Sequence, residues 1–286
     1  MVLRQSSANE YLSLGPTHGY LLKSYVMILL AVIRRVSSTR KDLSGLLFML
    51  YSPFLYLLGV KSIRSPLGFV YATDRETLRS FAYGFFKTHF FYLKDLEKLL
   101  GKLHFSVVVD VGANIGDFTL GAANTAEKIV AVEPAKRNFR MLEANVRANN
   151  LCNVVLVNAA ATDNEKDIYL QGNASDMFVV EDEGGELVKG LPLDAIAELY
   201  GIENIEVLKV DVQGHEQSAL LGIHNLLLKK AVKMFIIEVH IKRKVRVEDV
   251  VSFMEEHGYR LIYKDNYLFS QPHLYFTPSQ TSRCNI

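Results

Sequence analysis

From residue 105 onward, the chain alternates short apolar runs with longer amphipathic stretches. The apolar runs are rich in β-branched residues, as is typical of strands buried in a parallel sheet, and they predict strands near 106–111, 128–133, 153–158, 205–211 and 233–239. The intervening stretches predict helices near 117–126, 136–149, 193–199, 215–228 and 246–257. Two further runs, 260–264 and 274–277, indicate a terminal antiparallel hairpin. This alternation predicts an α/β fold built on a parallel sheet.

The pattern before residue 105 is different. Two apolar stretches, 25–33 and 43–60, flank a polar, basic loop, and Pro53 interrupts the second stretch where a spanning helix would kink. Three interpretations stay open for residues 20–60: helices packed on the α/β domain, an amphipathic anchor in peripheral contact with a membrane, or a membrane hairpin. We expect residues 1–65 to form an apolar, basic, helical extension and residues 66–286 to form the main domain, with the boundary at Ser65-Pro66.

The distribution of charge adds to this division. The 286 residues carry a net charge of +1, which by itself indicates no polyanionic partner, and 49% of them are apolar, enough for a sizeable core. Residues 1–104, however, hold 14 Lys and Arg against 6 Asp and Glu, so a basic part precedes an acidic part. The two cysteines, Cys152 and Cys284, form neither a disulfide framework nor a metal-ligand pattern, which predicts a cytoplasmic protein, with membrane association left open.

The first predicted strand leads directly into a short glycine turn. Asp110 stands near the strand end, Gly112, Asn114 and Gly116 form the turn, and apolar spacing resumes near Asp117, where a helix is expected to begin. Glycines allow close backbone approach to a ligand and positive φ angles. A dinucleotide fingerprint needs glycines at offsets 0, 2 and 5, whereas this chain has an acid at offset 5. A glycine-x-x-x-glycine turn with an acid at the strand end instead favours a ligand that carries an amine and a carboxylate, such as S-adenosylmethionine. The alternative is a tight turn that binds nothing.

A second acid supports the nucleoside interpretation. Glu133 ends the second predicted strand, 23 residues after Asp110, and Pro134 follows it. An acid at about this distance, at the tip of the second strand, is placed to hydrogen-bond ribose hydroxyls. We therefore predict that Glu133 binds the cofactor ribose.

Polar side chains also lie at the ends of the fourth and fifth strands. Lys209 and Asp211 alternate on one face of a strand, as do Glu238 and His240 on the next. Either set can be structural, since a buried Lys–Asp pair or a polar strand cap needs no ligand. Together with His215, the two acids and His240 could ligate a divalent cation, but no tight ligand spacing supports that option, and no metal is predicted.

In these segments the sequence resembles the FkbM-type S-adenosylmethionine-dependent methyltransferases. The resemblance runs from about Phe105 to Phe269 and rests on the segments DVGANIG, VEPAKRNFRMLEANVRANN, LKVDVQGHEQSALLG and IIEVH. It implies a class I methyltransferase (Rossmann-like) fold: a mostly parallel seven-stranded sheet with helices on both faces, here preceded by the N-terminal helical extension. It also implies that the small and amide residues Asn158 and Ala160 face the adenine ring.

The resemblance further places the methyl-transfer centre beside the segment that reads K-x-D-x-E-G-x-E in the family. Lys209, Asp211, Gly214 and Glu216 match this pattern, whereas Gln213 replaces the usual Glu and His215 stands where Ala is frequent. His215 is therefore a candidate base of this chain's own. Its alternative is a solvated loop residue. The candidate catalytic residues are Lys209, Asp211, His215, Glu238 and His240.

Taken together, these patterns predict an S-adenosyl-L-methionine-dependent methyltransferase. The resemblance, not the spacing, implies O-methylation of a hydroxyl on a sugar, a glycan or a small-molecule natural product. The sequence has neither a tryptophan platform nor a basic stripe beside the glycine turn, so no nucleic-acid partner is predicted. The alternatives are a nucleotide-dependent oxidoreductase and a membrane-tethered binding module with a vestigial cofactor site. The sequence sets no oligomeric state.

Overall fold

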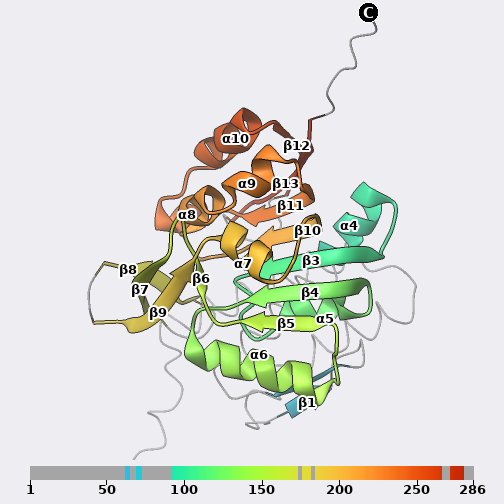
Figure 1. Cartoon of the computed structure of the whole chain (residues 1–286), viewed down its shortest axis with the longest axis vertical. Helices are drawn as coiled ribbons and strands as arrows, with labels where there is room; N and C mark the ends of the chain where they lie inside the picture. The colour runs from blue at the N-terminus through green and yellow to red at the C-terminus, as the bar shows by residue number, and fades with distance from the viewer. Residues whose placement is uncertain are drawn as a thin grey trace, which may run out of the picture.

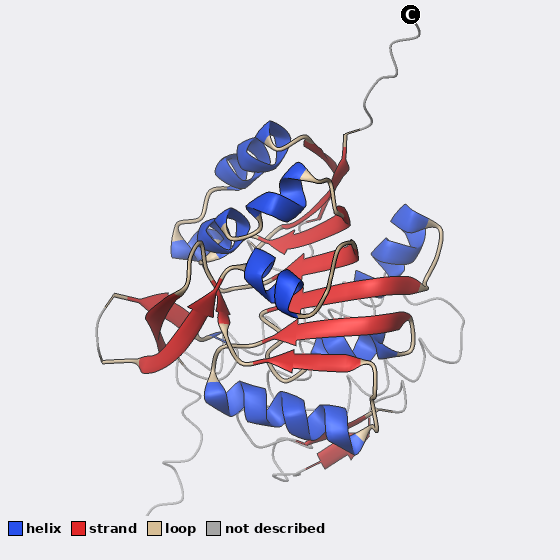
Figure 2. Ribbon diagram, viewed as in Figure 1, coloured by secondary structure: helices blue, strands red, loops and turns tan. Residues whose placement is uncertain are grey.

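A seven-stranded sheet forms the centre of the protein (Figures 1 and 2). The structure, a computed structural model, describes residues 62–64, 69–72, 92–172, 176–181, 184–265 and 271–279. In spatial order, the strands are β12 (Tyr259–Asp265), β13 (His273–Pro278), β11 (Val232–Glu238), β10 (Ile205–Val210), β3 (Phe105–Val111), β4 (Ala126–Val132) and β5 (Val154–Val157). Strands β11, β10, β3, β4 and β5 are parallel, and β13 is antiparallel to both of its neighbours. The predicted fold class, with its closing hairpin, is confirmed.

Helices cover both faces of this sheet, and alternate strand residues face two separate cores. On one side Val108, Val207 and Met234 pack with α4 (Leu93–Leu100), α5 (Asp117–Ala123) and α6 (Lys136–Ala148). On the other side Val109, Leu208 and Phe235 pack with α7 (Leu193–Leu199), α8 (Glu216–Leu221), α9 (His224–Leu228) and α10 (Val247–Glu256). Burial on both faces explains why the strands read as unbroken apolar runs.

The order of the strands determines where a ligand can bind. After β3 the chain crosses to β4 on one side, and after β10 it crosses to β11 on the other. The neighbours β3 and β10 therefore form the point at which the strand order reverses. Open α/β sheets bind their ligands there, beyond the carboxyl ends of the strands. The side chains that follow Val111 and Val210 lie at this edge.

A second, four-stranded sheet lies between β5 and α7, and the sequence patterns did not predict it. Its order is β6 (Ala160–Ala161), β9 (Glu186–Leu191), β7 (Lys166–Gln171) and β8 (Phe178–Val180). These strands are two to six residues long, and much of their surface is exposed. Their apolar side chains bury only a small separate core, so they lack the strong hydrophobic signal of the central strands. Figure 1 shows this sheet beyond the carboxyl ends of the central strands.

The single helix predicted over 215–228 is wrong, because the structure contains two helices separated by Gly222 and Ile223. A Cβ atom on Gly222 would lie 2.0 Å from the carbonyl oxygen of Thr162, so this position admits only glycine. The second helix, α9, then starts on a cap from outside. The Asp194 carboxylate accepts hydrogen bonds from the backbone N–H groups of Asn225 and Leu226, at 2.7 and 3.1 Å. This cap satisfies backbone N–H groups in the first turn of α9, which have no carbonyl partner within the helix.

At the amino-terminal side, the structure describes a two-stranded ribbon of β1 (Ser62–Arg64) and β2 (Val70–Ala72). The Asn149 side chain at the end of α6 binds both backbone groups of Val70, at 2.7 and 2.6 Å, and so attaches the ribbon to the main domain. The domain boundary predicted at 65/66 lies between these paired strands. Apart from β1, the helical extension predicted over residues 1–65, with its possible membrane segment 20–60, lies outside the described residues and stays a prediction.

Within the described ranges, no helix combines the length and the apolar character needed to cross a bilayer.

The packing at Gly112 leads to a stability prediction. Gly112 and Gly101 both have positive φ angles, 77° and 66°, but a Cβ on Gly112 would lie 1.9 Å from the Asp211 carbonyl oxygen, whereas a Cβ on Gly101 would meet nothing within 4 Å. We expect Gly101→Ala to cost about 1–2 kcal/mol, the strain of the left-handed conformation alone. Gly112→Ala should cost at least about 2 kcal/mol more, because β3 and β10 must separate. Urea denaturation of both variants measures the difference, and equal losses would contradict the steric argument.

Candidate active site

A cleft lies at the carboxyl edge of the central sheet. Its walls come from the turns after β3 and β4, the ends of β10 and β11, and the β7–β8 hairpin of the second sheet. Eight of the twelve predicted site residues line it: Gly112, Asn114, Glu133, Ala160, Lys209, Asp211, His215 and Glu238. The remaining four, Asp110, Gly116, Asn158 and His240, lie behind or beside these residues. The expected gathering of strand-end side chains therefore occurs, in two layers.

The glycine turn after β3 has the positive φ angles that were predicted, and close packing within the protein also requires its glycines. Gly112 and Gly116 have φ angles of 77° and 98°, but the space that their missing side chains leave is used by the protein. A Cβ on Gly112 would clash with the backbone of Asp211, and one on Gly116 would lie under 3 Å from the Leu120 and Leu142 side chains. These glycines therefore allow β3, β10 and α6 to pack closely, and Gly112 also lines the cleft, so its contact with a ligand stays a prediction.

Glu133 lies at the tip of β4 and is buried. Its carboxylate accepts hydrogen bonds from the backbone N–H groups of Asn114 and Ala135, at 2.8 and 3.0 Å, and from the Asn138 side chain at 3.4 Å. Burial raises the pKa of Glu133 to about 7, although these three donors oppose the rise. The carboxylate thus fixes the glycine turn while its edge lines the cleft, where ribose hydroxyls could still donate to it.

Asn158 and Ala160 differ in position. The Asn158 side chain donates to the carbonyl oxygens of Glu133 and Pro134, at 2.8 and 3.0 Å, and so braces the turn after β4. Ala160, at the start of the second sheet, is buried and lines the cleft. Of the two residues that the family resemblance assigned to the adenine ring, only Ala160 is placed at the cleft wall.

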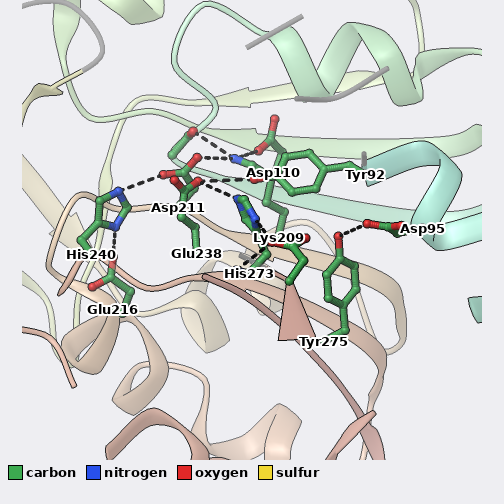
Figure 3. Close-up of polar contacts among 12 residues, drawn as sticks. Tyr92, Asp95, Asp110, Lys209, Asp211, Glu216, Glu238, His240, His273 and Tyr275 are labelled. Atoms are coloured by element: carbon green, nitrogen blue, oxygen red, sulfur yellow. Dashed lines mark hydrogen bonds and ion pairs between the residues drawn. The ribbon is translucent and has the colours of Figure 1, made fainter. Parts of the chain in front are cut away.

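Lys209 links the two strands at the reversal point (Figure 3). Its Nζ donates to Asp110 Oδ1 at 3.1 Å and to the Gly112 carbonyl oxygen at 3.4 Å, and it lies 3.5 Å from Asp211 Oδ2. Asp110 is fully buried and also accepts a hydrogen bond from Thr119 Oγ1 at 2.6 Å. Asp110 therefore serves as the buried counter-charge of Lys209, while Asp211 carries its carboxylate to the cleft.

Glu238 lies at the tip of β11 beside the strand of the closing hairpin. The Tyr92 hydroxyl donates to its Oε2 at 3.4 Å, and His273 Nε2 lies 3.4 Å from the same oxygen. On its other side His273 Nδ1 contacts Asp265 Oδ1 at 2.7 Å. Burial would lower the pKa of His273, but Glu238 and Asp265 outweigh it and raise that pKa to about 9. His273 is therefore a buried cation at neutral pH that neutralises part of the acidic charge.

His240 follows Glu238 and is fully buried. Its Nδ1 contacts Glu216 Oε1 at 2.6 Å, and its Nε2 points toward Asp211 Oδ1, 3.6 Å away (Figure 3). Burial lowers the pKa of His240, and the surrounding acids, Glu216 first, more than reverse this, so the net direction is upward. His240 does not line the cleft, so a substrate in the cleft meets Asp211 and Glu238 first.

His215 is separate from this buried network. It lies just before α8, lines the cleft, and its buried Nε2 has no hydrogen-bond partner among the described residues. Burial lowers the pKa of His215, with a contribution from the nearby Lys166, while Glu216 and Asp163 oppose the shift. His215 is thus a neutral imidazole near pH 7, the form that can accept a proton.

Sequence reasoning missed several cleft residues. Leu170, Met177, Phe178 and Val179 come from the second sheet, which the hydrophobic pattern did not reveal. Tyr92 precedes the alternating pattern that begins at residue 105, and no motif marked it as a site residue. Glu216 was noted only as a match to the family pattern, and its contact with His240 required the fold, because 24 residues separate the two in sequence.

The charged residues that line the cleft indicate which cofactor the cleft can bind. Its lining includes four carboxylates, Asp117, Glu133, Asp211 and Glu238, against one lysine, Lys209. Such a lining repels the pyrophosphate of a dinucleotide and attracts a ligand that carries an ammonium and a sulfonium. The described residues therefore fit S-adenosylmethionine. Glu133 would hold its ribose, and Asp117, which follows the β3 turn and lines the cleft, would face its cationic end.

The strand order, the antiparallel β13 and the acidic cleft at the reversal point define a class I methyltransferase. More particularly, the chain belongs to the FkbM methyltransferase family, because the family's sequence model, Methyltransferase FkbM domain, matches residues 110–261. This confirms the predicted family and its cofactor, S-adenosylmethionine.

The individual proteins that the chain matches share 30% sequence identity or less with it. The chain is 30% identical over 154 residues to the hexuronic acid methyltransferase AglP of Haloferax volcanii, covering 52% of this chain and 62% of AglP. It is 28% identical over 204 residues to the AMB antimetabolite synthetase AmbE of Pseudomonas aeruginosa, covering 54% of this chain and 10% of AmbE. The chain thus spans less than two thirds of either curated relative. The crystal structure of the methyltransferase FkbM from Methylobacillus flagellatus KT has a TM-score of 0.49 and 17% identity, covering 90% of this chain and 60% of that chain.

The raised pKa of Glu133 predicts how cofactor binding depends on pH. Below pH 7 the carboxyl is increasingly protonated, and hydrogen bonds to a charged acceptor are stronger than those to a neutral one. Affinity for S-adenosylmethionine should therefore rise as pH increases through about 7. Glu133→Gln should bind about tenfold more weakly and lose this dependence in calorimetric titrations. Glu206→Gln, at the amino end of β10 and away from the cleft, is the control that should keep both the affinity and its pH dependence. A Glu133→Gln variant with unchanged affinity would contradict the assignment.

Proposed function

We propose that this protein transfers the methyl group of S-adenosylmethionine to a hydroxyl oxygen of a sugar or glycan. The observation that carries the proposal is the Asp211 carboxylate, held in the cleft at the strand-order reversal, next to the turn that fits the cofactor. The name of one relative, the hexuronic acid methyltransferase AglP, supports a sugar as the acceptor class. A hydroxyl on a small-molecule natural product is the second acceptor class to be tested.

The residues of the chain suit an in-line displacement. When bound, S-adenosylmethionine supplies a methyl carbon that the acceptor oxygen attacks while the carbon–sulfur bond breaks and its electron pair stays on sulfur. Asp211 is placed to orient the hydroxyl and to take its proton, because its carboxylate lines the cleft while Lys209 and His240 flank it on the protein side. Lys209 and Glu238 shape the same wall. Holding the reactants in line supplies most of the rate enhancement in such a reaction.

The direct test of this proposal is transfer of an isotopically labelled methyl group by the purified full chain. The acceptor panel contains oligosaccharides with and without a uronic acid, and polyketide-type alcohols, and mass spectrometry locates the added methyl group. We expect methylation of a sugar hydroxyl. Binding of S-adenosylmethionine without transfer to any acceptor would favour a binding module, and binding of a nicotinamide dinucleotide instead would favour an oxidoreductase.

The role of Asp211 can be separated from a structural one. Asp211→Asn keeps the shape of the side chain but removes the proton acceptor, so turnover should fall by about 10²–10⁴. The affinity for S-adenosylmethionine should change little, because Glu133 and the glycine turn are intact. Turnover is measured per folded molecule alongside the melting temperature. A destabilised variant with a normal rate would leave Asp211 as a partner of Lys209 only.

His215 gives a pH-dependent prediction. A base must be deprotonated to act, and burial together with Lys166 lowers the pKa of His215 below 6.5, against Glu216 and Asp163. If His215 takes the proton, the single-turnover rate should rise with pH through a value below 6.5 and then level off. His215→Ala should abolish this step in the pH–rate profile. A profile that keeps its inflection in the variant would assign the ionisation to another residue.

A further inference from the structure

We propose that Asp211, Glu238 and His240, here called the Asp211–Glu238–His240 cluster, form a binding site for a divalent first-row metal ion. One ligand atom from each residue lies within 4.8 Å of the other two, and all three residues are buried or nearly so. An ion about 2.0–2.2 Å from each ligand would hold pairs of ligand atoms about 3.0–4.4 Å apart. Small side-chain rotations therefore suffice to close the cluster around an ion.

The orientation of His240 supports a metal independently of the acids. Its side chain is 0% exposed, its Nδ1 is held by Glu216 at 2.6 Å, and its Nε2 points into the cluster, 3.6 Å from Asp211 Oδ1. Among the described residues, Nε2 has no hydrogen-bond partner. A metal-binding histidine characteristically donates the N–H of its second ring nitrogen to a carboxylate, a backbone carbonyl or water. This hydrogen bond fixes the tautomer and directs the other nitrogen at the ion. Glu216 is therefore the positioning residue of the site.

The charge around the cluster also favours a cation. Five carboxylates are labelled in Figure 3, Asp95, Asp110, Asp211, Glu216 and Glu238, and Asp265 beside His273 is a sixth, against Lys209, His240 and His273. Even with both imidazoles protonated, negative charges outnumber positive ones by six to three. Lys209 approaches the Oδ2 oxygen of Asp211, so the Oδ1 oxygen that faces His240 is on the other side of that carboxylate. A divalent ion would offset much of the remaining charge.

The ligand types of the Asp211–Glu238–His240 cluster limit which metal ions it can bind. Two carboxylates and one imidazole combine the ligand types of Mg²⁺ and Mn²⁺ with those of Zn²⁺ and Fe²⁺. Asp211 and Glu238 line the cleft, so an ion between them has coordination positions on the cleft side. Resting on the proposed function, we infer that these positions take the acceptor hydroxyl. With the ion bound, Asp211 would orient the hydroxyl through the metal instead of taking its proton. Coordination would lower the pKa of that hydroxyl, and its proton would leave to His215 or to solvent.

Binding of Mn²⁺ to the full chain tests this inference without an activity assay. The protein is first treated with chelator and dialysed, and electron paramagnetic resonance then follows the bound ion. We expect saturable binding of one Mn²⁺ per chain and a nitrogen hyperfine coupling from His240. His240→Gln should abolish the coupling and weaken binding at least tenfold. Glu216→Gln should weaken it about 10–100-fold, the usual effect of losing a supporting carboxylate.

Two further variants guard against loss of folding. His215→Gln replaces an imidazole that lines the same cleft outside the cluster, and it should leave Mn²⁺ binding and the nitrogen coupling unchanged. Asp211→Asn, at a partly exposed position, should weaken binding while circular dichroism stays native. No saturable binding of Mn²⁺, Mg²⁺ or Zn²⁺ by the folded protein at millimolar concentration would overturn the proposal. So would a nitrogen coupling that survives His240→Gln.

The outcome is separable from that of the proposed function. Full-rate methyl transfer in the presence of chelator, with no metal binding, would overturn the metal site and leave the methyltransferase intact. Mn²⁺ binding that depends on His240, with no transfer to any hydroxyl, would establish the site and overturn the proposed function. Transfer that stops with chelator and returns with Mn²⁺ supports both.

Discussion

The fold depends most on the ion cluster that Lys209 builds between β3 and β10. One ammonium contacts the Asp110 carboxylate, the Gly112 carbonyl oxygen and the Asp211 carboxylate, and so joins the strand end, the glycine turn and the reacting edge of the cleft. Buried ions are costly unless they are paired, and removal of one partner typically costs about 3–5 kcal/mol. This cost restrains the relative positions of the three segments. The geometry of the cleft therefore follows from electrostatic neutralisation inside the sheet.

The same cluster explains why much of the site was predictable from the sequence. Asp110, Glu133, Asp211 and Glu238 each lie at or next to the end of an apolar strand. Parallel strands of one sheet end at the same edge, so their adjacency could be inferred without coordinates. The central strands and most helices were predicted within two or three residues, because burial on both faces leaves a strong hydrophobic signal. His240 was correctly placed beside the acids, but its position behind the cleft wall depends on Glu216 and could not be read from spacing.

Other features were not accessible from local patterns. The second sheet consists of short, half-exposed strands, and its pairing of β6 with β9 joins residues about 30 positions apart. The division between α8 and α9 depends on how closely Gly222 approaches Thr162, a contact across the domain. The packing role of Gly112 and Gly116 was not predicted, because sequence shows a missing side chain but not the atoms that occupy its space. In each case a long-range contact decides the local structure.

The second sheet has a consequence for how the family can diversify. The cleft wall opposite the strand ends is supplied by Leu170, Met177, Phe178 and Val179, all of which come from one uninterrupted insertion between β5 and α7. Its side chains bury a core of their own, separate from the two cores of the central sheet. The ends of the segment are tied to the cofactor half, because Ala160 lines the cleft and Thr162 packs on Gly222. The β7–β8 hairpin is therefore the part that can be exchanged to reshape this wall while the glycine turn and Glu133 stay in place.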